Sequence, residues 1–89
     1  MSPHPVSWFE IEPGWRVQSP DGGELGSVEE VLGDRDEDIF DGLSVVAGLG
    51  GRPHYVPAEH IVSIASDGAV TLVIDHDAFE QLPEPGRQP

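Results

Sequence analysis

The clearest pattern of apolar and polar residues lies in the first third of the chain. Residues 15–19 alternate, so that Trp15 and Val17 share one face, as in a half-buried strand. Residues 20–23 follow with the sequence Pro-Asp-Gly-Gly. Asp-Gly and Gly-Gly adopt positive φ at little cost, so this segment predicts the turn of a β-hairpin.

The second arm of this hairpin, residues 24–32, does not alternate strictly. Its apolar spacing taken alone also fits one or two turns of helix. Gly26 and the valines of the segment favour a strand, and a bulge near Gly26 and Ser27 would restore an inward apolar face. We therefore expect a strand here.

Four further segments have the composition of strands and are separated by turn residues. They are residues 39–48, 52–56, 61–65 and 69–74. In the first of them Leu43 and Val45 fall on one face, which we assign to the core, and Phe40 and Val46 fall on the other. Val62 also points away from the face assigned to the core. These outward apolar side chains are candidates for an interface.

The two ends of the chain differ from this pattern. Residues 1–7 are expected to form a flexible tail, and residues 83–89 a proline-rich tail, leaving a domain over residues 8–82. Residues 8–11 fit a short strand or an extended arm, and Trp8 either covers the core or is exposed for a partner.

Residues 75–82 predict a short helix that begins at a capping-box-like Asp77, with Phe79 and Leu82 on one apolar face. Six short strands with turns about every ten residues and one late helix indicate an all-β fold. We expect a small antiparallel β-barrel of about six short strands with one short C-terminal helix. A closed barrel also removes the edge strands, which a chain without lysine protects poorly.

The charge balance excludes several classes of partner. Asp and Glu total 17 against four arginines and no lysine, and the formal net charge is −13. Nucleic-acid binding relies on Lys and Arg at phosphates, so it is not expected, nor is binding to an anionic membrane. A basic protein surface is the natural complement.

The chain has no cysteine, no secretory signal and no membrane-length apolar run, so we expect a cytoplasmic protein.

Three segments together resemble the PRC-barrel family. The first is Gly14-Trp15-Arg16-Val17 followed by Asp21-Gly22-Gly23-Glu24-Leu25-Gly26-Ser27-Val28, the second is Tyr55-Val56-Pro57-Ala58-Glu59-His60-Ile61, and the third is Ala69-Val70-Thr71-Leu72. The resemblance implies a small β-barrel that serves as an interaction module, without catalytic residues or a cofactor. The membrane anchor and the second domain found in two better-known kinds of member have no counterpart in the sequence, so their specific functions are not expected here.

An acidic stretch offers a candidate metal site at Asp34, Asp36, Asp38 and Asp41. Alternating acids resemble the first ligands of a calcium loop. However, Ile39 stands where an EF-hand needs glycine, and Val45 where it needs glutamate. A looser divalent site and a solvated acidic hairpin loop both remain consistent with this stretch.

Other candidate chemistry has weaker support. Asp75-His76-Asp77 has the residue types of a metal site, but helix capping explains the acids equally well. No serine lies in a G-x-S-x-G elbow, and the glycines at 48, 50 and 51 lack the lysine of a phosphate loop. We therefore do not expect an enzyme.

The sequence thus predicts a non-enzymatic protein–protein interaction module. Its expected interaction residues are Trp8, Phe40, Val46 and Val62, and its partner is either a second copy in a homodimer or a basic protein. The alternative is a divalent-metal or small-ligand binding protein that uses the acidic loop 34–41.

Overall fold

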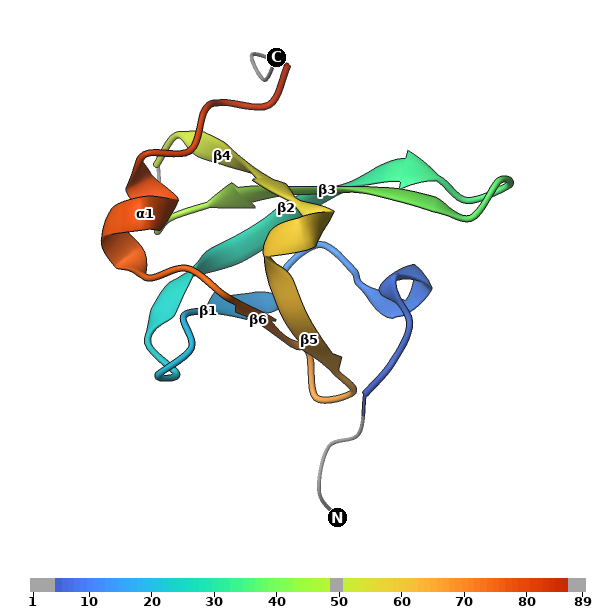
Figure 1. Cartoon of the computed structure of the whole chain (residues 1–89), viewed down its shortest axis with the longest axis horizontal. Helices are drawn as coiled ribbons and strands as arrows, with labels where there is room; N and C mark the ends of the chain where they lie inside the picture. Colours follow the sequence, from blue (N-terminus) through green and yellow to red (C-terminus); the bar gives the residue numbers. More distant parts are fainter. Residues whose placement is uncertain (1–4, 49–50, 87–89) are drawn as a thin grey trace.

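The computed structural model describes residues 5–48 and 51–86 of the chain. Residues 49–50, in the predicted turn after the third strand, lie outside this part. Within it the chain forms six strands, one α-helix and two short 3₁₀ helices (Figure 1). In order they are η1 (Trp8–Glu10), β1 (Arg16–Gln18), β2 (Glu24–Asp34), β3 (Ile39–Val46), β4 (Pro53–Pro57), η2 (Ala58–His60), β5 (Ile61–Ala65), β6 (Ala69–Leu72) and α1 (His76–Glu80).

The six strands form one mixed sheet in the order β4-β3-β2-β1-β6-β5. The sequential pairs β1–β2, β2–β3, β3–β4 and β5–β6 are antiparallel, as predicted. β1 and β6 pair in parallel, with Val17 opposite Val70, so the prediction of a wholly antiparallel sheet is wrong. A tight turn fixes the direction of neighbouring strands only, and the β1–β6 pair joins strands that are distant in the chain.

The sheet is strongly curved but does not close within the described residues. β4, β3 and β2 make one layer, and β1, β6 and β5 lie across from them (Figure 1). β4 and β5 are the two ends of the strand order, and the three residues of η2 join them at one corner. No strand pairing links β4 to β5 in residues 5–48 and 51–86. The observed architecture is therefore an open, mostly β fold rather than the closed barrel expected.

Glycine allows β2 and β3 to approach closely where the sheet bends. A Cβ atom built on Gly26 would lie 2.3 Å from the backbone oxygen of Val46. The pairing with β1 passes from Gly26 opposite Val17 to Glu24 opposite Gln18, which leaves Leu25 as the extra residue. The bulge predicted near Gly26 and Ser27 thus lies at Leu25, directly before the glycine.

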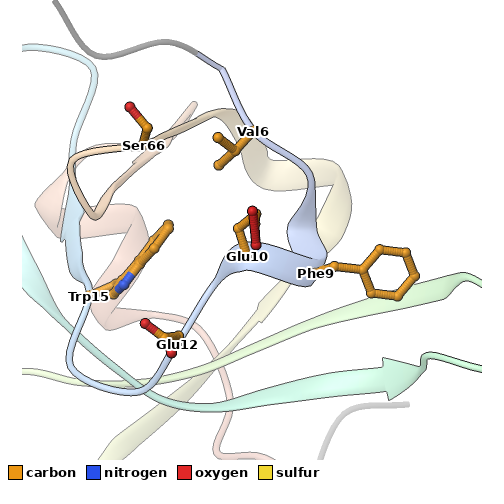
Figure 2. A pocket seen from close by; sticks show the side chains of 6 residues that line it. All are labelled: Val6, Phe9, Glu10, Glu12, Trp15 and Ser66. Atoms are coloured by element: carbon orange, nitrogen blue, oxygen red, sulfur yellow. The ribbon is translucent and has the colours of Figure 1, made fainter. Parts of the chain in front are cut away.

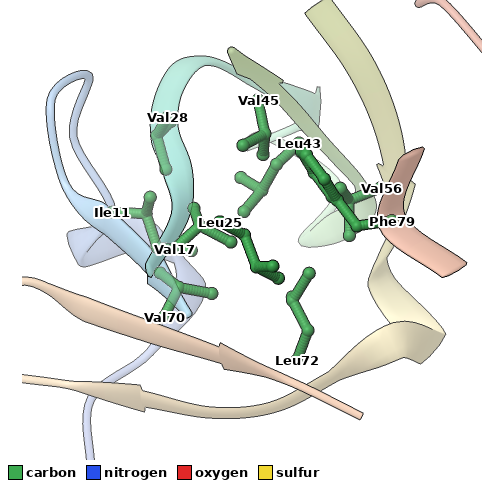
Figure 3. Close-up of a cluster of buried hydrophobic side chains, with 10 residues drawn as sticks. All are labelled: Ile11, Val17, Leu25, Val28, Leu43, Val45, Val56, Val70, Leu72 and Phe79. Atoms are coloured by element: carbon green, nitrogen blue, oxygen red, sulfur yellow. The ribbon is translucent and has the colours of Figure 1, made fainter. Parts of the chain in front are cut away.

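The core fills the space inside the curved sheet. Ten buried apolar side chains form it (Figure 3), and Phe79 of α1 enters from one end. The ten are Ile11, Val17, Leu25, Val28, Leu43, Val45, Val56, Val70, Leu72 and Phe79. The inward assignment of Val17, Leu43 and Val45 is confirmed. The predicted late helix is present, and its Phe79 is fully buried.

The start of α1 differs from the prediction by two residues. The N-cap is Asp75, not Asp77, because the Asp75 carboxylate accepts a hydrogen bond from the backbone N–H of Ala78 at 2.9 Å. Asp75 has extended backbone geometry, which the N-cap position requires, and Asp77 lies inside the first turn.

The predicted strand or extended arm at residues 8–11 is instead a 3₁₀ turn. Ser7 caps η1, since its hydroxyl oxygen accepts a hydrogen bond from the N–H of Phe9 at 3.2 Å. Ser7 and Glu10 have the S-x-x-E spacing that is typical of a helix start. The prediction of a strand or arm used the apolar pattern and not this spacing. Ile11, directly after the turn, is 1% exposed and belongs to the core.

Chain segments on either side of the domain contact the edge strands. Pro5 pairs with Ala65 of β5, and the N–H of Val6 donates to the oxygen of Ile64 at 2.9 Å. At the other edge the N–H of Tyr55 in β4 donates to the oxygen of Pro83 at 2.7 Å. Residues 1–4 and 87–89 of the predicted tails lie outside the described part.

No helix in residues 5–48 and 51–86 combines the length and apolarity that a bilayer crossing requires.

Candidate protein-interaction site

A largely apolar hollow of about 410 Å³ lies between the N-terminal segment, β3, η2 and β5. We call it the apolar hollow. Its walls include Val6, Trp8, Phe40, Ile61, Val62 and Ile64. Three of the four interaction residues expected from sequence, Trp8, Phe40 and Val62, therefore meet around one surface depression, although they come from three separate segments.

The fourth residue, Val46, does not belong to this hollow. It lies at the last position of β3, opposite Ser27 of β2 and Pro53 of β4, and is half-buried. Phe40 lies near the opposite end of β3. Sharing a strand face is therefore not sufficient to bring two side chains into one site.

Trp8 is held in place by contacts on two sides. Its indole N–H donates to a carboxylate oxygen of Asp38 at 3.0 Å, and its ring stacks on Phe40 with centroids 4.9 Å apart and planes at 9°. Both rings are half-buried and pack against the core. Trp8 thus both covers the core and forms a wall of the hollow.

Arg35 ties the tip of the β2–β3 hairpin to η1. Its guanidinium carbon lies 5.7 Å from the ring centroid of Trp8 and 5.6 Å from that of Phe9. The side chain also donates to the backbone oxygen of Phe9 at 3.2 Å. The role of Arg35 is not evident from the sequence, because nothing in the local pattern reveals that the hairpin tip meets residues 8–10.

Val62 lies at an irregular position of an edge strand. Ile61 pairs with Leu72 and Ser63 with Thr71, so Val62 is the extra residue of a bulge in β5. Its side chain is 63% exposed. Bulges at sheet edges commonly redirect a side chain, and here the result is an exposed valine at the rim of the hollow.

A second hollow, of about 320 Å³, lies on the other side of Val6, and we call it the acidic hollow. Figure 2 shows Glu10, Glu12, Trp15, Ser66 and Val6 around it, while the Phe9 ring is directed away. Trp8 lines the apolar hollow and Trp15 lines the acidic one.

Three of the four aspartates of the candidate metal site make separate local contacts. Asp34 accepts hydrogen bonds from the N–H groups of Asp36 at 3.0 Å and Glu37 at 3.3 Å, and Asp38 accepts from Trp8. Asp41 accepts from the Tyr55 hydroxyl through its backbone oxygen. Among residues 5–48 and 51–86 no three His, Asp or Glu side chains are arranged to hold a metal ion.

A third hollow contains Ser19, Asp21, Asp75 and His76 around about 450 Å³. The Ser19 hydroxyl donates to the Asp21 carboxylate, and His76 lies 3.1 Å from Glu80 in an i,i+4 pair. The hydrogen bond from Ser19, with a further one from the N–H of Gly23, holds the pKa of Asp21 below its ordinary value. Serine and histidine are each bonded to a different carboxylate, so the relay that activates a serine nucleophile is not formed in this arrangement.

Tyr55 links β4 to β3 through its side chain. Its hydroxyl donates to the backbone oxygen of Asp41 at 3.1 Å. Burial raises the pKa of the Tyr55 phenol above its ordinary value, and the nearby Asp41 and Glu59 raise it further. The negative charges of Asp41 and Glu59 therefore act on the Tyr55 phenol.

Comparison with known proteins gives no matching family model and no matching curated protein. The family resemblance of the sequence therefore remains an expectation, and the functional argument rests on the geometry above.

Proposed function

We propose that the protein is a non-enzymatic interaction module that binds another protein through the apolar hollow. The observation that carries the proposal is the convergence of Trp8, Phe40 and Val62 around one depression at a sheet edge. Trp is enriched among residues that dominate binding energy, and apolar side chains beside a hollow provide the buried centre that an interface needs.

The arrangement of the polar groups supports a role without catalysis or a bound metal. Ser19 and His76 contact different carboxylates. The carboxylates of Asp34 and Asp38 accept hydrogen bonds from backbone and indole N–H groups respectively. The net charge of −13 supports the further expectation that the protein binds neither nucleic acid nor an anionic membrane. A sequence without cysteine is the ground on which we also propose a cytoplasmic location.

We also propose that the fold is an open variant of the PRC-barrel. The opening β1–β2 hairpin, the strand that ends in Val56-Pro57, and the 3₁₀ turn that follows it occur in the expected order. The two edge strands meet at η2, which is the corner where a closed barrel would join them.

Site-specific photocrosslinking tests the interaction function. Val62 is replaced by p-benzoylphenylalanine in the full chain, produced in its native host. Val73, 56% exposed and outside both hollows, provides the matched control. We expect a discrete protein adduct from position 62 and not from position 73, and an adduct of twice the chain mass would identify a homodimer. Equal adducts at both positions, or none at position 62 in a folded protein, would contradict the proposal.

A further inference from the structure

Resting on the proposed function, we infer that the partner presents a basic segment with an apolar centre, which places an aliphatic side chain in the apolar hollow and a lysine or arginine in the acidic hollow. The two depressions lie side by side, since Val6 belongs to the walls of both. A single short segment can therefore reach both of them.

The acidic hollow has the chemistry of a site for a cationic side chain. Glu10 and Glu12 supply carboxylates, and Trp15 supplies an indole (Figure 2). Carboxylates form charge-assisted hydrogen bonds with ammonium and guanidinium groups, and the face of an indole attracts a cation. Both glutamates are exposed, so an arriving side chain reaches them without a rearrangement of the core.

No basic residue of the described chain lines either hollow. Arg35 packs on Trp8 and Phe9 on the hairpin side of η1, and Arg52 lies 3.5 Å from Glu84 at the opposite sheet edge. Within residues 5–48 and 51–86, Glu10 and Glu12 therefore have no basic side chain beside them in the acidic hollow, and a partner can supply the positive charge. With a net charge of −13, the whole chain also attracts a basic partner before contact.

The same charges argue against a second copy as the occupant. A symmetric dimer built on this surface would bring Glu10 and Glu12 of one copy toward the same acidic surface of another copy, and each copy carries a net charge of −13. Like charges placed opposite one another oppose association, so the complementary surface is a basic one.

The Trp15 indole reports on the acidic hollow, and the Trp8 indole reports on the apolar hollow together with its hydrogen bond to Asp38. The ¹⁵N-labelled full chain has two indole N–H signals in an NMR spectrum, and Trp8→Phe assigns them. The probe is the acetylated, amidated peptide Lys-Lys-Val-Ile-Val-Lys-Lys. Peptides with glutamate or glutamine in place of lysine serve as charge controls. We expect the lysine peptide to shift both indole signals, and raising the salt to about 0.5 M to weaken its binding several-fold.

Two pairs of variants test the placement of the cation. Glu10→Gln with Glu12→Gln should weaken binding of the lysine peptide about fivefold, the range expected for two exposed ion pairs. Glu24→Gln with Glu30→Gln changes the net charge equally on β2, outside both hollows, and should change binding less than twofold by the same screening argument. Equal losses in the two pairs would overturn the placement.

The outcomes also separate this inference from the function on which it rests. A crosslinked partner at position 62, together with equal binding of the lysine and glutamine peptides, would overturn the basic partner and leave the interaction function standing. A homodimer adduct at position 62 would likewise overturn the inference alone. The absence of any adduct at position 62 would remove the interaction function itself.

Discussion

Tyr55, the single tyrosine of the chain, combines burial with a hydrogen bond to the neighbouring strand. Burial and the negative charges of Asp41 and Glu59 both disfavour the phenolate, and the pKa is raised accordingly. Tyrosine pairs the two strands here as a neutral hydrogen-bond donor, a role that an ionised phenolate cannot fill.

Titration of this tyrosine should have its midpoint above the ordinary value of about 10. Because the folded-state pKa is raised, the stabilising contribution of Tyr55 is complete below the unfolded pKa and is lost as the pH rises through the folded one. Absorbance near 295 nm gives the midpoint directly.

Tyr55→Phe provides the control. The variant should lose about 1 kcal/mol of stability at neutral pH, because the hydrogen bond to Asp41 is removed. It should also lose the alkaline decline of wild-type stability. A phenol that titrates at or below 10 in the folded protein would contradict the burial and charge environment described here.

At the level of single residues, the apolar alternation did not reveal which side chains meet, and it assigned Phe40 away from the core, against which the Phe40 ring packs. Trp8, Phe40 and Val62 converge because η1 folds back on the β2–β3 hairpin, while Val46 lies at the far end of the same strand. Arg35 illustrates the limit. Its contact with Trp8 and Phe9 depends on a tertiary approach between residues 26 or more positions apart.

At the level of elements, the approach of β2 to β3 depends on Gly26. The added Cβ of Gly26→Ala would meet the Val46 oxygen, a backbone atom that cannot rotate away. We expect a loss of about 2–4 kcal/mol, or a local change in pairing between the two strands. Urea denaturation followed by circular dichroism measures the loss.

Ser27→Ala, at the next position of the same strand, is the matched control for this variant. Alanine fits a strand at that half-buried position, so the change should stay below about 1 kcal/mol. If the two variants were equally stable, the close approach of the two strands would be disproved.

The elements themselves were largely readable from local patterns. All six strands and the late helix lie where apolar alternation and turn residues indicated, because hairpins are specified by neighbouring residues. The 3₁₀ turn at residues 8–10 had a local signal in the spacing of Ser7 and Glu10, whereas two other errors concern what local pattern does not encode. The parallel β1–β6 pair and the open edge between β4 and β5 follow from how the whole sheet curls.

At the level of the whole molecule, the charge balance acts on the fold as well as on its partners. The 89 residues include seventeen Asp and Glu and only four arginines, and the ion pair of Arg52 with Glu84 is exposed. An exposed pair contributes little, whereas repulsion among many like charges opposes the compact state. Partner binding at Glu10 and Glu12 would then stabilise the fold by relieving part of this repulsion.

The same balance predicts that salt stabilises the protein. Raising NaCl from about 0.02 M to about 0.5 M shortens the Debye length several-fold, so it screens repulsion across the whole surface and removes few attractive pairs. The thermal unfolding midpoint should therefore rise.

CaCl₂ at matched ionic strength separates this screening from the metal-binding alternative at Asp34, Asp36, Asp38 and Asp41. Because the Asp34 and Asp38 carboxylates accept separate hydrogen bonds and no three acidic side chains of residues 5–48 and 51–86 are arranged to hold a metal ion, we expect no shift beyond that of NaCl apart from the small extra screening by any divalent cation. MgCl₂ supplies that reference, and a rise specific to calcium would return the acidic loop to consideration as a binding site.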